Sequence, residues 1–107
     1  MFKIGIWIDD ERQPSKFFKD QVSLVLKAKN FTEAISLIES AKREKINLEL
    51  FISFDHDLGL GKSGYDIAKY LVEHNIDIAG FTIHSMNPVG RKNIYQLLTH
   101  YGYKYIG

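Results

Sequence analysis

The sequence predicts an α/β fold, a three-layer sandwich in which helices cover both faces of a five-stranded parallel sheet. Apolar runs rich in β-branched residues occupy 4–8 and 51–54 and stop at acidic residues, which is typical of strands covered on both faces. Helical spacing of apolar residues recurs between such runs, and this alternation favours parallel strands joined by right-handed crossovers. The 107 residues are expected to form a single domain over 1–107.

The composition fits a chain that folds unaided around one core. Hydrophobic residues make up 45%, aromatic residues 13% and charged residues 25%. The net charge of +1, with Lys and Arg spread along the chain, gives no electrostatic argument for a nucleic-acid or membrane partner. The absence of cysteine excludes disulfides and thiolate chemistry and fits a cytoplasmic location. The apolar N-terminus reaches Asp9 too soon to span a bilayer, so we expect a buried first strand.

The segment between the two strong strands predicts a weaker strand and then a helix. The strand covers 22–28. Asn30 follows, with Glu33 three residues later, which is the arrangement of a capping box at a helix start. Helical spacing then predicts an inward-facing stripe of Phe31, Ala34, Ile35, Ile38 and Ala41.

A later helix is predicted to start at Ser63. Asp66 lies three residues on and belongs to this helix start, so we leave it out of any site. The inward residues of this helix are expected to be Tyr65, Ala68, Leu71 and Val72. Before it, Gly59, Gly61 and Gly64 allow the backbone to wrap closely around a ligand, although glycines alone are weak support for a site.

The C-terminal third predicts a strand, a helix and a short final strand. The strand covers 79–83, and Asn87 followed by Pro88 predicts the N-cap and first residue of the last helix. Gly102 is its predicted stop, and residues 103–106 are expected to form the fifth strand. The inward residues of the last helix are expected to be Ile94, Leu97, Leu98 and Tyr101.

Acidic residues and histidines follow three of the predicted strands, where ligands bind in parallel α/β sheets. The set comprises Asp9, Asp10, Asp55, His56, Asp57 and His84. Four neighbouring carboxylates repel one another, and a divalent cation relieves that repulsion. Oxygen ligands suit Mg²⁺, Mn²⁺ or Ca²⁺, while the histidines also suit Mn²⁺, Fe²⁺ or Zn²⁺, and the spacing does not choose among them. Strand alternation favours Asp55 and Asp57 as the pair on one side.

Several neighbours have two interpretations each. Arg12 can clamp a phosphate or form a surface salt bridge, and Asn87 can cap the last helix or donate to a substrate. His84 fits a general acid, a metal ligand, a phosphate donor or a core histidine. Ser85 and the first amides of the last helix fit an anion pocket, which Arg91 and Lys92 would strengthen. We interpret His74 and His100, near helix ends, as structural.

Three motifs give the chain a family resemblance. Ile8-Asp-Asp-Glu-Arg-Gln-Pro14 resembles the start of response-regulator receiver domains, but the lysine that those domains carry late in the chain is missing here. Together, Trp7-Ile-Asp-Asp-Glu-Arg12, Ser53-Phe-Asp-His-Asp-Leu-Gly59 and His84-Ser-Met-Asn-Pro-Val-Gly90 are similar to the cyclic-phosphate-processing receiver domains. The resemblance implies the strand order 2-1-3-4-5. It also implies a metal-dependent hydrolase, a phosphodiesterase that opens a cyclic phosphate of a nucleotide or nucleic-acid end.

The resemblance also implies roles for individual residues. Asp9, Asp10 and Asp57 would hold a divalent metal, with Mg²⁺ or Mn²⁺ expected. The catalytic set would be Asp55, His56, Asp57 and His84, and the substrate-binding set would be Arg12, Ser85 and Asn87. Asp55 or His56 would assist the attacking water while His84 protonates the leaving oxygen. Alternatively, Asp57 itself attacks the phosphorus atom.

Two other functions remain open at this point. The chain can be a non-catalytic receiver-like module that binds a cyclic nucleotide or docks a protein partner. The C-terminal tyrosines, Tyr95, Tyr101, Tyr103 and Tyr105, can stack nucleic-acid bases, although we favour a role for them in a small core or a dimer face.

Overall fold

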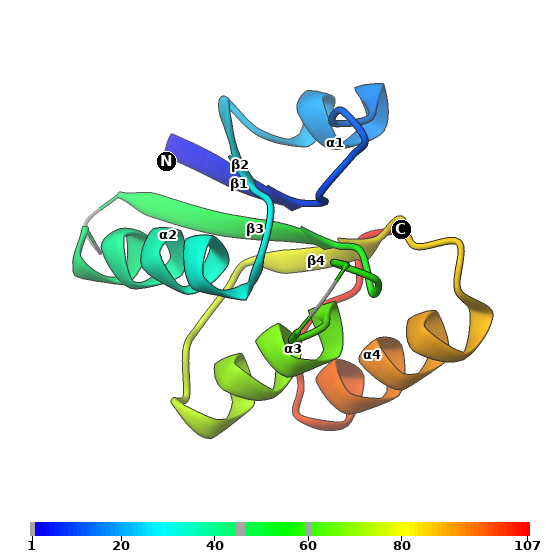
Figure 1. Cartoon of the computed structure of the whole chain (residues 1–107). Helices are drawn as coiled ribbons and strands as arrows, with labels where there is room; N and C mark the ends of the chain where they lie inside the picture. Colours follow the sequence, from blue (N-terminus) through cyan, green and yellow to red (C-terminus); the bar gives the residue numbers. More distant parts are fainter. Residues whose placement is uncertain (1, 45–46, 60) are drawn as a thin grey trace.

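The computed structural model describes residues 2–44, 47–59 and 61–107. Four parallel strands form one sheet in the order β2-β1-β3-β4 (Figure 1). They are β1 (Phe2–Ile8), β2 (Leu24–Ala28), β3 (Leu48–Phe54) and β4 (Gly80–Ile83). The predicted α/β class, parallel sheet and order of the first four strands are confirmed.

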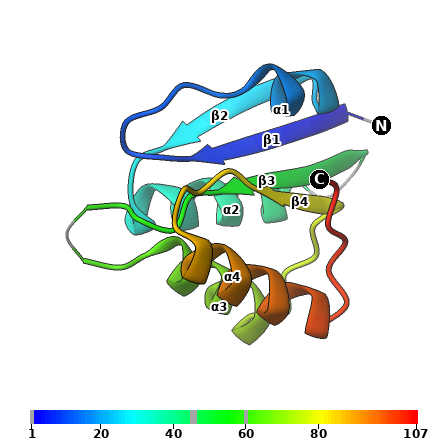
Figure 2. The same ribbon diagram turned by 90° about the vertical axis from the view of Figure 1, so that its right-hand side faces the viewer.

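Four helices alternate with these strands: α1 (Lys16–Gln21), α2 (Phe31–Arg43), α3 (Gly64–Glu73) and α4 (Pro88–His100). α1 covers one face of the sheet, and α2, α3 and α4 cover the other (Figures 1 and 2). Right-handed crossovers produce this division. From β1 the chain moves across the sheet to β2 in one direction, whereas the connections from β2 to β3 and from β3 to β4 move in the opposite direction. Among the described residues, no helix has the length and apolar character needed to cross a membrane.

The predicted helix starts are confirmed by their hydrogen bonds. Asn30 Oδ1 accepts from the Glu33 amide at 2.9 Å, and the Ser63 amide donates to Asp66 Oδ2 at 2.7 Å. Asn87 Oδ1 accepts from the Gly90 amide at 2.9 Å. Each bond satisfies a backbone group that the first turn leaves without an intrahelical partner.

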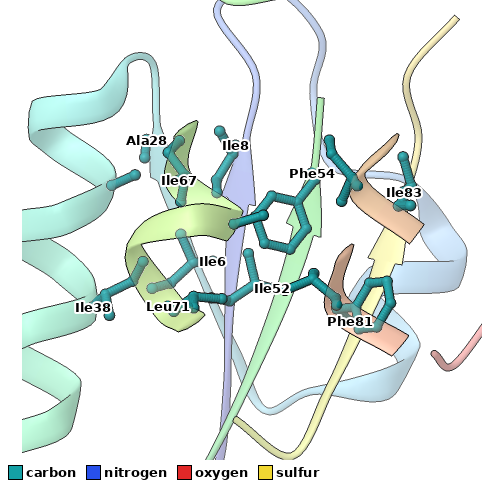
Figure 3. Close-up of a cluster of buried hydrophobic side chains, with 14 of the residues drawn as sticks. Ile6, Ile8, Ala28, Ile38, Ile52, Phe54, Ile67, Leu71, Phe81 and Ile83 are labelled. Carbon is teal, nitrogen blue, oxygen red and sulfur yellow. The ribbon is translucent and has the colours of Figure 1, made fainter. Parts of the chain in front are cut away.

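The core lies between the sheet and the three-helix layer (Figure 3). Ile6, Ile52 and Phe81 come from neighbouring strands, are fully buried and face this layer. Two details of the predicted helix stripes are wrong. Ile67, which the α3 stripe omitted, is fully buried, and Tyr101 is 58% exposed because α4 ends at His100, one residue before it.

The predicted fifth strand is reduced to one bridge, between Phe81 and Tyr105. The Phe81 amide donates to Lys104 O at 2.9 Å, and the Ile106 amide donates to Phe81 O at 2.8 Å. The last residue is held by a side chain, because the Gly107 carbonyl accepts from the Thr82 hydroxyl at 2.7 Å. In a parallel ladder the next bond would join the Ile83 amide to the Ile106 carbonyl, and the described residues do not form it. The sheet therefore has four strands instead of the predicted five.

Candidate active site

Three polar residues continue the backbone ladder one step past the strand ends. The amides of Asp9, Asp55 and His84 donate to Ala28 O, Ile8 O and Phe54 O at 3.0, 3.1 and 3.0 Å. Register pairs Ile8 with Phe54 and Phe54 with Ile83, so the three residues after these form one row across the sheet. In Figure 2 the arrowheads of β1 and β3 point toward the same end of the molecule, where α4 begins. We call these three residues the polar row.

The polar row gathers two carboxylates and an imidazole. One ligand atom from each of Asp9, Asp55 and His84 lies within 4.8 Å of the others, and no second such group exists among the described residues. Asp9 Oδ1 accepts from the amides of Glu11 and Arg12, each at 2.8 Å. Burial raises the pKa of Asp9, but the bonds from these amides and from His84 outweigh it and hold the pKa below its usual value. Asp9 is therefore ionised at neutral pH.

The Arg12 guanidinium neutralises this buried negative charge. Its Nε lies 3.0 Å from Asp9 Oδ2 and its Nη2 lies 3.4 Å from Asp55 Oδ2. The side chains of Asp9 and Asp55 are 1% and 7% exposed, whereas that of Arg12 is 43% exposed. The Arg12 carbonyl is anchored by the Trp7 indole N–H at 3.0 Å. Arg12 thus forms ion pairs at the rim of the site, with room to move toward solvent.

His84 is held on three sides. Its Nε2 lies 3.0 Å from Asp9 Oδ2, its Nδ1 lies 2.8 Å from Ser53 Oγ, and its ring stacks on Trp7 with centroids 3.7 Å apart. A carboxylate can only accept, so Nε2 carries the proton and Nδ1 accepts from the Ser53 hydroxyl in the neutral ring. Burial lowers the pKa of His84, and the hydrogen bond to Asp9 offsets only part of that effect. His84 is therefore neutral near pH 7.

A second polar group lies at the solvent-facing rim. His56 Nδ1 is 3.1 Å from Asp57 Oδ1, and Asn87 Nδ2 is 3.4 Å from Asp57 Oδ2. The hydrogen bond from His56, assisted by that from Asn87, lowers the pKa of Asp57 against a smaller opposing effect of burial. The Asp57 side chain is 66% exposed and that of His56 is 23% exposed. This arrangement orients the His56 ring, and its Nε2 has no hydrogen-bond partner among the described residues.

The His56 ring needs a glycine at the start of α4. A Cβ built on Gly90 would lie 2.3 Å from His56 Cγ and 2.6 Å from its Cδ2. Ser85 supports the same turn, since its buried Oγ accepts from the Asn87 amide at 3.1 Å. Asn87 caps α4 through its Oδ1, as one of the two interpretations held, and its amide group reaches Asp57.

A Gly90→Ala variant is expected to displace His56 together with its backbone, because the new Cβ would also lie 2.7 Å from His56 Cβ. Overpacking of this kind costs about 1–3 kcal/mol, of which the preference for alanine over glycine in a helix offsets up to about 1 kcal/mol. We expect the His56 ring signals in ¹H–¹³C NMR spectra to shift while those of His74 and His100 stay in place. Val89→Ala, an exposed change in the same turn, is the control. Unchanged His56 signals in Gly90→Ala would contradict the close contact.

The structure places some of the predicted site residues in the polar row and others at the solvent-facing rim. Of the predicted metal ligands, Asp9 lies in the polar row, whereas Asp10 and Asp57 are exposed. The expected pairing of Asp55 with Asp57 by strand alternation is wrong, because β3 ends at Phe54 and the alternation ends with it. Asp55 turns inward to Arg12, and Asp57 turns outward to His56 and Asn87.

Three residues of the site stand in the quoted motifs but received no role from the sequence. Ser53 is fully buried and bonds His84, Trp7 stacks on His84, and Gly90 makes room for His56. The available signal was a single hydroxyl residue in the apolar run Phe-Ile-Ser-Phe at 51–54, because a buried polar side chain requires a partner. The predicted glycine loop includes Leu60, which lies outside the described residues.

The polar row has a donor set that fits a divalent metal. Asp9 is ionised, His84 is neutral, and both are the protonation states that metal ligands require. Two carboxylates and one imidazole suit Mg²⁺, Mn²⁺, Fe²⁺ or Zn²⁺. Arg12 already contacts the oxygens that such an ion would use, so the guanidinium and a metal would compete for them.

Comparison with known protein families matches residues 4–100 to the family described as the cyclic-phosphate processing receiver domain. Searches among curated proteins and among solved structures find no match. The match covers the sheet from residue 4 onward, the four helices α1 to α4, the polar row, and His56, Asp57 and Asn87. The chain therefore belongs to the family of cyclic-phosphate processing receiver domains.

Proposed function

We propose that the protein is a metal-dependent phosphodiesterase that opens a cyclic phosphate of a nucleotide or nucleic-acid end. The observation that carries this proposal is the polar row, in which Asp9, Asp55 and His84 meet at the carboxyl ends of three neighbouring parallel strands. Membership of a cyclic-phosphate processing family supports the substrate class. The alternative of a module that binds without cutting has no observation of its own in its favour.

Asp9, Asp55 and His84 would hold the ion, with Asp10 and Asp57 near the rim. A bound divalent ion would polarise the phosphate and lower the pKa of water beside it. Arg12, which is displaced from its carboxylates in this proposal, has five N–H donors suited to phosphate oxygens. Asn87 would orient the phosphate or Asp57 through its amide group.

The reaction adds one water across one P–O bond. The water oxygen bonds to phosphorus, the bond from phosphorus to one ribose oxygen breaks, and that oxygen takes up a proton to become a hydroxyl. We assign acceptance of the water proton to the Asp55 carboxylate. The lowered pKa of His84 fits a ligand better than the general acid predicted from the sequence, so we assign that role to His56. Asp57 orients His56 through the 3.1 Å contact.

The test is a panel of 2′,3′-cyclic nucleotides, 3′,5′-cyclic nucleotides and cyclic oligonucleotides, incubated with Mg²⁺, Mn²⁺ or EDTA and followed by ³¹P NMR. We expect metal-dependent opening of one ring type. Asp55→Asn and His56→Ala should each lower its rate at least about 100-fold. His100→Ala, at the exposed end of α4, is the control and should keep the full rate. Intact rings with a ligand bound at the polar row would replace the hydrolase by a binding module.

A further inference from the structure

A groove of about 500 Å³ lies beside the candidate active site, between α4 and the C-terminal tail. Its lining includes Ile83, Met86, Arg91, Lys92, Tyr95 and Tyr105. Met86 is 82% exposed, Tyr95 44% and Tyr105 37%, so a set of large apolar side chains faces solvent here. A volume in this range, within about 300–1,000 Å³, is typical of sites for small organic ligands.

The groove exists because the fifth strand stops after one bridge. Phe81 uses its amide and carbonyl on the tail, and His84 directs its amide to β3. Along a parallel strand, the backbone groups of successive residues point alternately to the two neighbouring strands. The amide and carbonyl of Ile83 therefore point to the open edge of the sheet, as those of Phe81 do. Among the described residues, no backbone bond from the tail reaches that amide or carbonyl. The groove thus combines an apolar wall with a backbone donor and acceptor.

The aromatic part of the groove is held in place. Tyr95 and Tyr105 meet edge to face with ring centroids 5.1 Å apart, and Tyr105 also contacts the buried Phe81 ring at 5.4 Å. An aromatic surface fixed in this way can stack a nucleobase with little loss of side-chain freedom. The other two tyrosines of the predicted stacking set differ. Tyr103 donates its hydroxyl to Leu71 O and Ile76 O, and Tyr101 lies outside the groove.

The groove adjoins the segment 84–87, which contributes His84 and Asn87 to the candidate active site. Ser85 lines the groove, and its hydroxyl accepts from the amide of Asn87, whose side chain reaches Asp57. His84 and Asn87 are three residues apart, which spans at most about 11 Å of chain. Arg91 and Lys92 place two positive charges on the groove side of this segment. A ligand with a phosphate in the active site and a second phosphate near these cations matches that pattern of charge.

We propose that the groove binds the base and phosphate of a second nucleotide, so that the substrate is an oligonucleotide that contains or ends in the cyclic phosphate. This inference rests on the proposed function for the chemistry of the first nucleotide. A protein partner would also cover apolar side chains. The groove begins at Ser85, next to His84 of the polar row, and two cations line it, and both observations favour the nucleotide.

The test measures binding instead of turnover, so that it is independent of ring opening. The linear dinucleotide pApA and 5′-AMP are titrated into the full chain in EDTA by isothermal calorimetry. We expect pApA to bind at least about 10-fold more tightly than AMP, the scale that one stacked base contributes. Tyr95→Ala and the double change Arg91→Ala with Lys92→Ala should bring the two affinities within about 2-fold. Tyr95→Phe should retain the preference, and Lys19→Ala, on α1, is the charge control.

Each result separates the two proposals. Preference for pApA that disappears in the groove variants supports the groove even if the ³¹P panel shows no ring opening. Equal affinity for pApA and AMP overturns the inference even if mononucleotide rings are opened. A dimer in sedimentation that Tyr95→Ala abolishes, without any preference for pApA, would make the groove an interface between copies and would also overturn it.

Discussion

Gly64→Ala is expected to lower the free energy of unfolding by about 3 kcal/mol or more, the upper range for overpacking. A Cβ at this position would lie 1.9 Å from the Asp55 carbonyl oxygen and 2.9 Å from its carbonyl carbon. Both are backbone atoms, so no side-chain rotation relieves the contact. The Gly64 amide also donates to His56 O at 2.9 Å, which ties the start of α3 to the end of β3. Asp55 cannot keep its place in the polar row unless residue 64 lacks a side chain.

Urea unfolding followed by circular dichroism measures this loss. Gly61→Ala is the matched control, because a Cβ there meets no atom within 4 Å, although its φ of +96° adds backbone strain of about 1–2 kcal/mol. Gly64 is not at positive φ, so the loss in Gly64→Ala reports the clash, and Gly61→Ala shows what backbone strain costs without one. A loss in Gly64→Ala no larger than that in Gly61→Ala would contradict a clash with the Asp55 carbonyl.

Arg12→Ala is expected to destabilise the protein by about 2 kcal/mol in EDTA. The change leaves the buried carboxylates of Asp9 and Asp55 without their counter-charge. Removal of one partner of a fully buried pair costs about 3–5 kcal/mol, and the 43% exposure of Arg12 reduces that figure through solvent screening. The same change removes the group that competes with a metal for these oxygens.

Thermal unfolding with and without Mn²⁺ tests both consequences. We expect Mn²⁺ to raise the Tm of Arg12→Ala by more than it raises that of the unchanged protein, because a ligand of the folded state adds about 2.7 kcal/mol at 100 times its Kd. Arg43→Ala, which removes an exposed arginine of α2, should respond to Mn²⁺ as the unchanged protein does. An Mn²⁺ effect that is equal or smaller in Arg12→Ala would place the ion away from the polar row.

The sequence located the strand ends well, and this explains how much of the site was predictable. Apolar runs ending at Ile8, Phe54 and Ile83 correspond to the observed ends of β1, β3 and β4. Parallel register then places the next residues of each strand in one row, so the meeting of Asp9, Asp55 and His84 follows from local pattern and sheet geometry. The helix caps at Asn30, Ser63 and Asn87 were predictable for the same reason, since each satisfies backbone groups nearby in sequence.

The errors concern positions where side chains, not periodicity, decide the path of the chain. Asp57 follows a bend in the chain, so strand alternation no longer determines which way its side chain points. Its hydrogen bonds to His56 and Asn87 determine that direction instead. The tail has a strand-like pattern, but among the described residues it pairs with β4 at one bridge, Phe81 with Tyr105, and the Gly107 carbonyl accepts from the side chain of Thr82. The spacing of apolar residues cannot predict these contacts, because each joins residues from separate parts of the fold or depends on the rotamer of one side chain.

The polar row also acts on the folding of the sheet itself. If any of its three strands paired one residue out of register, the side chains would exchange faces, and Asp9, Asp55 or His84 would enter the apolar layer beside Ile67 and Leu71. A carboxylate in that layer would have no counter-charge, and its desolvation would make the shifted sheet unstable. Residues selected for chemistry at the strand ends would therefore also exclude misaligned pairings while the chain folds.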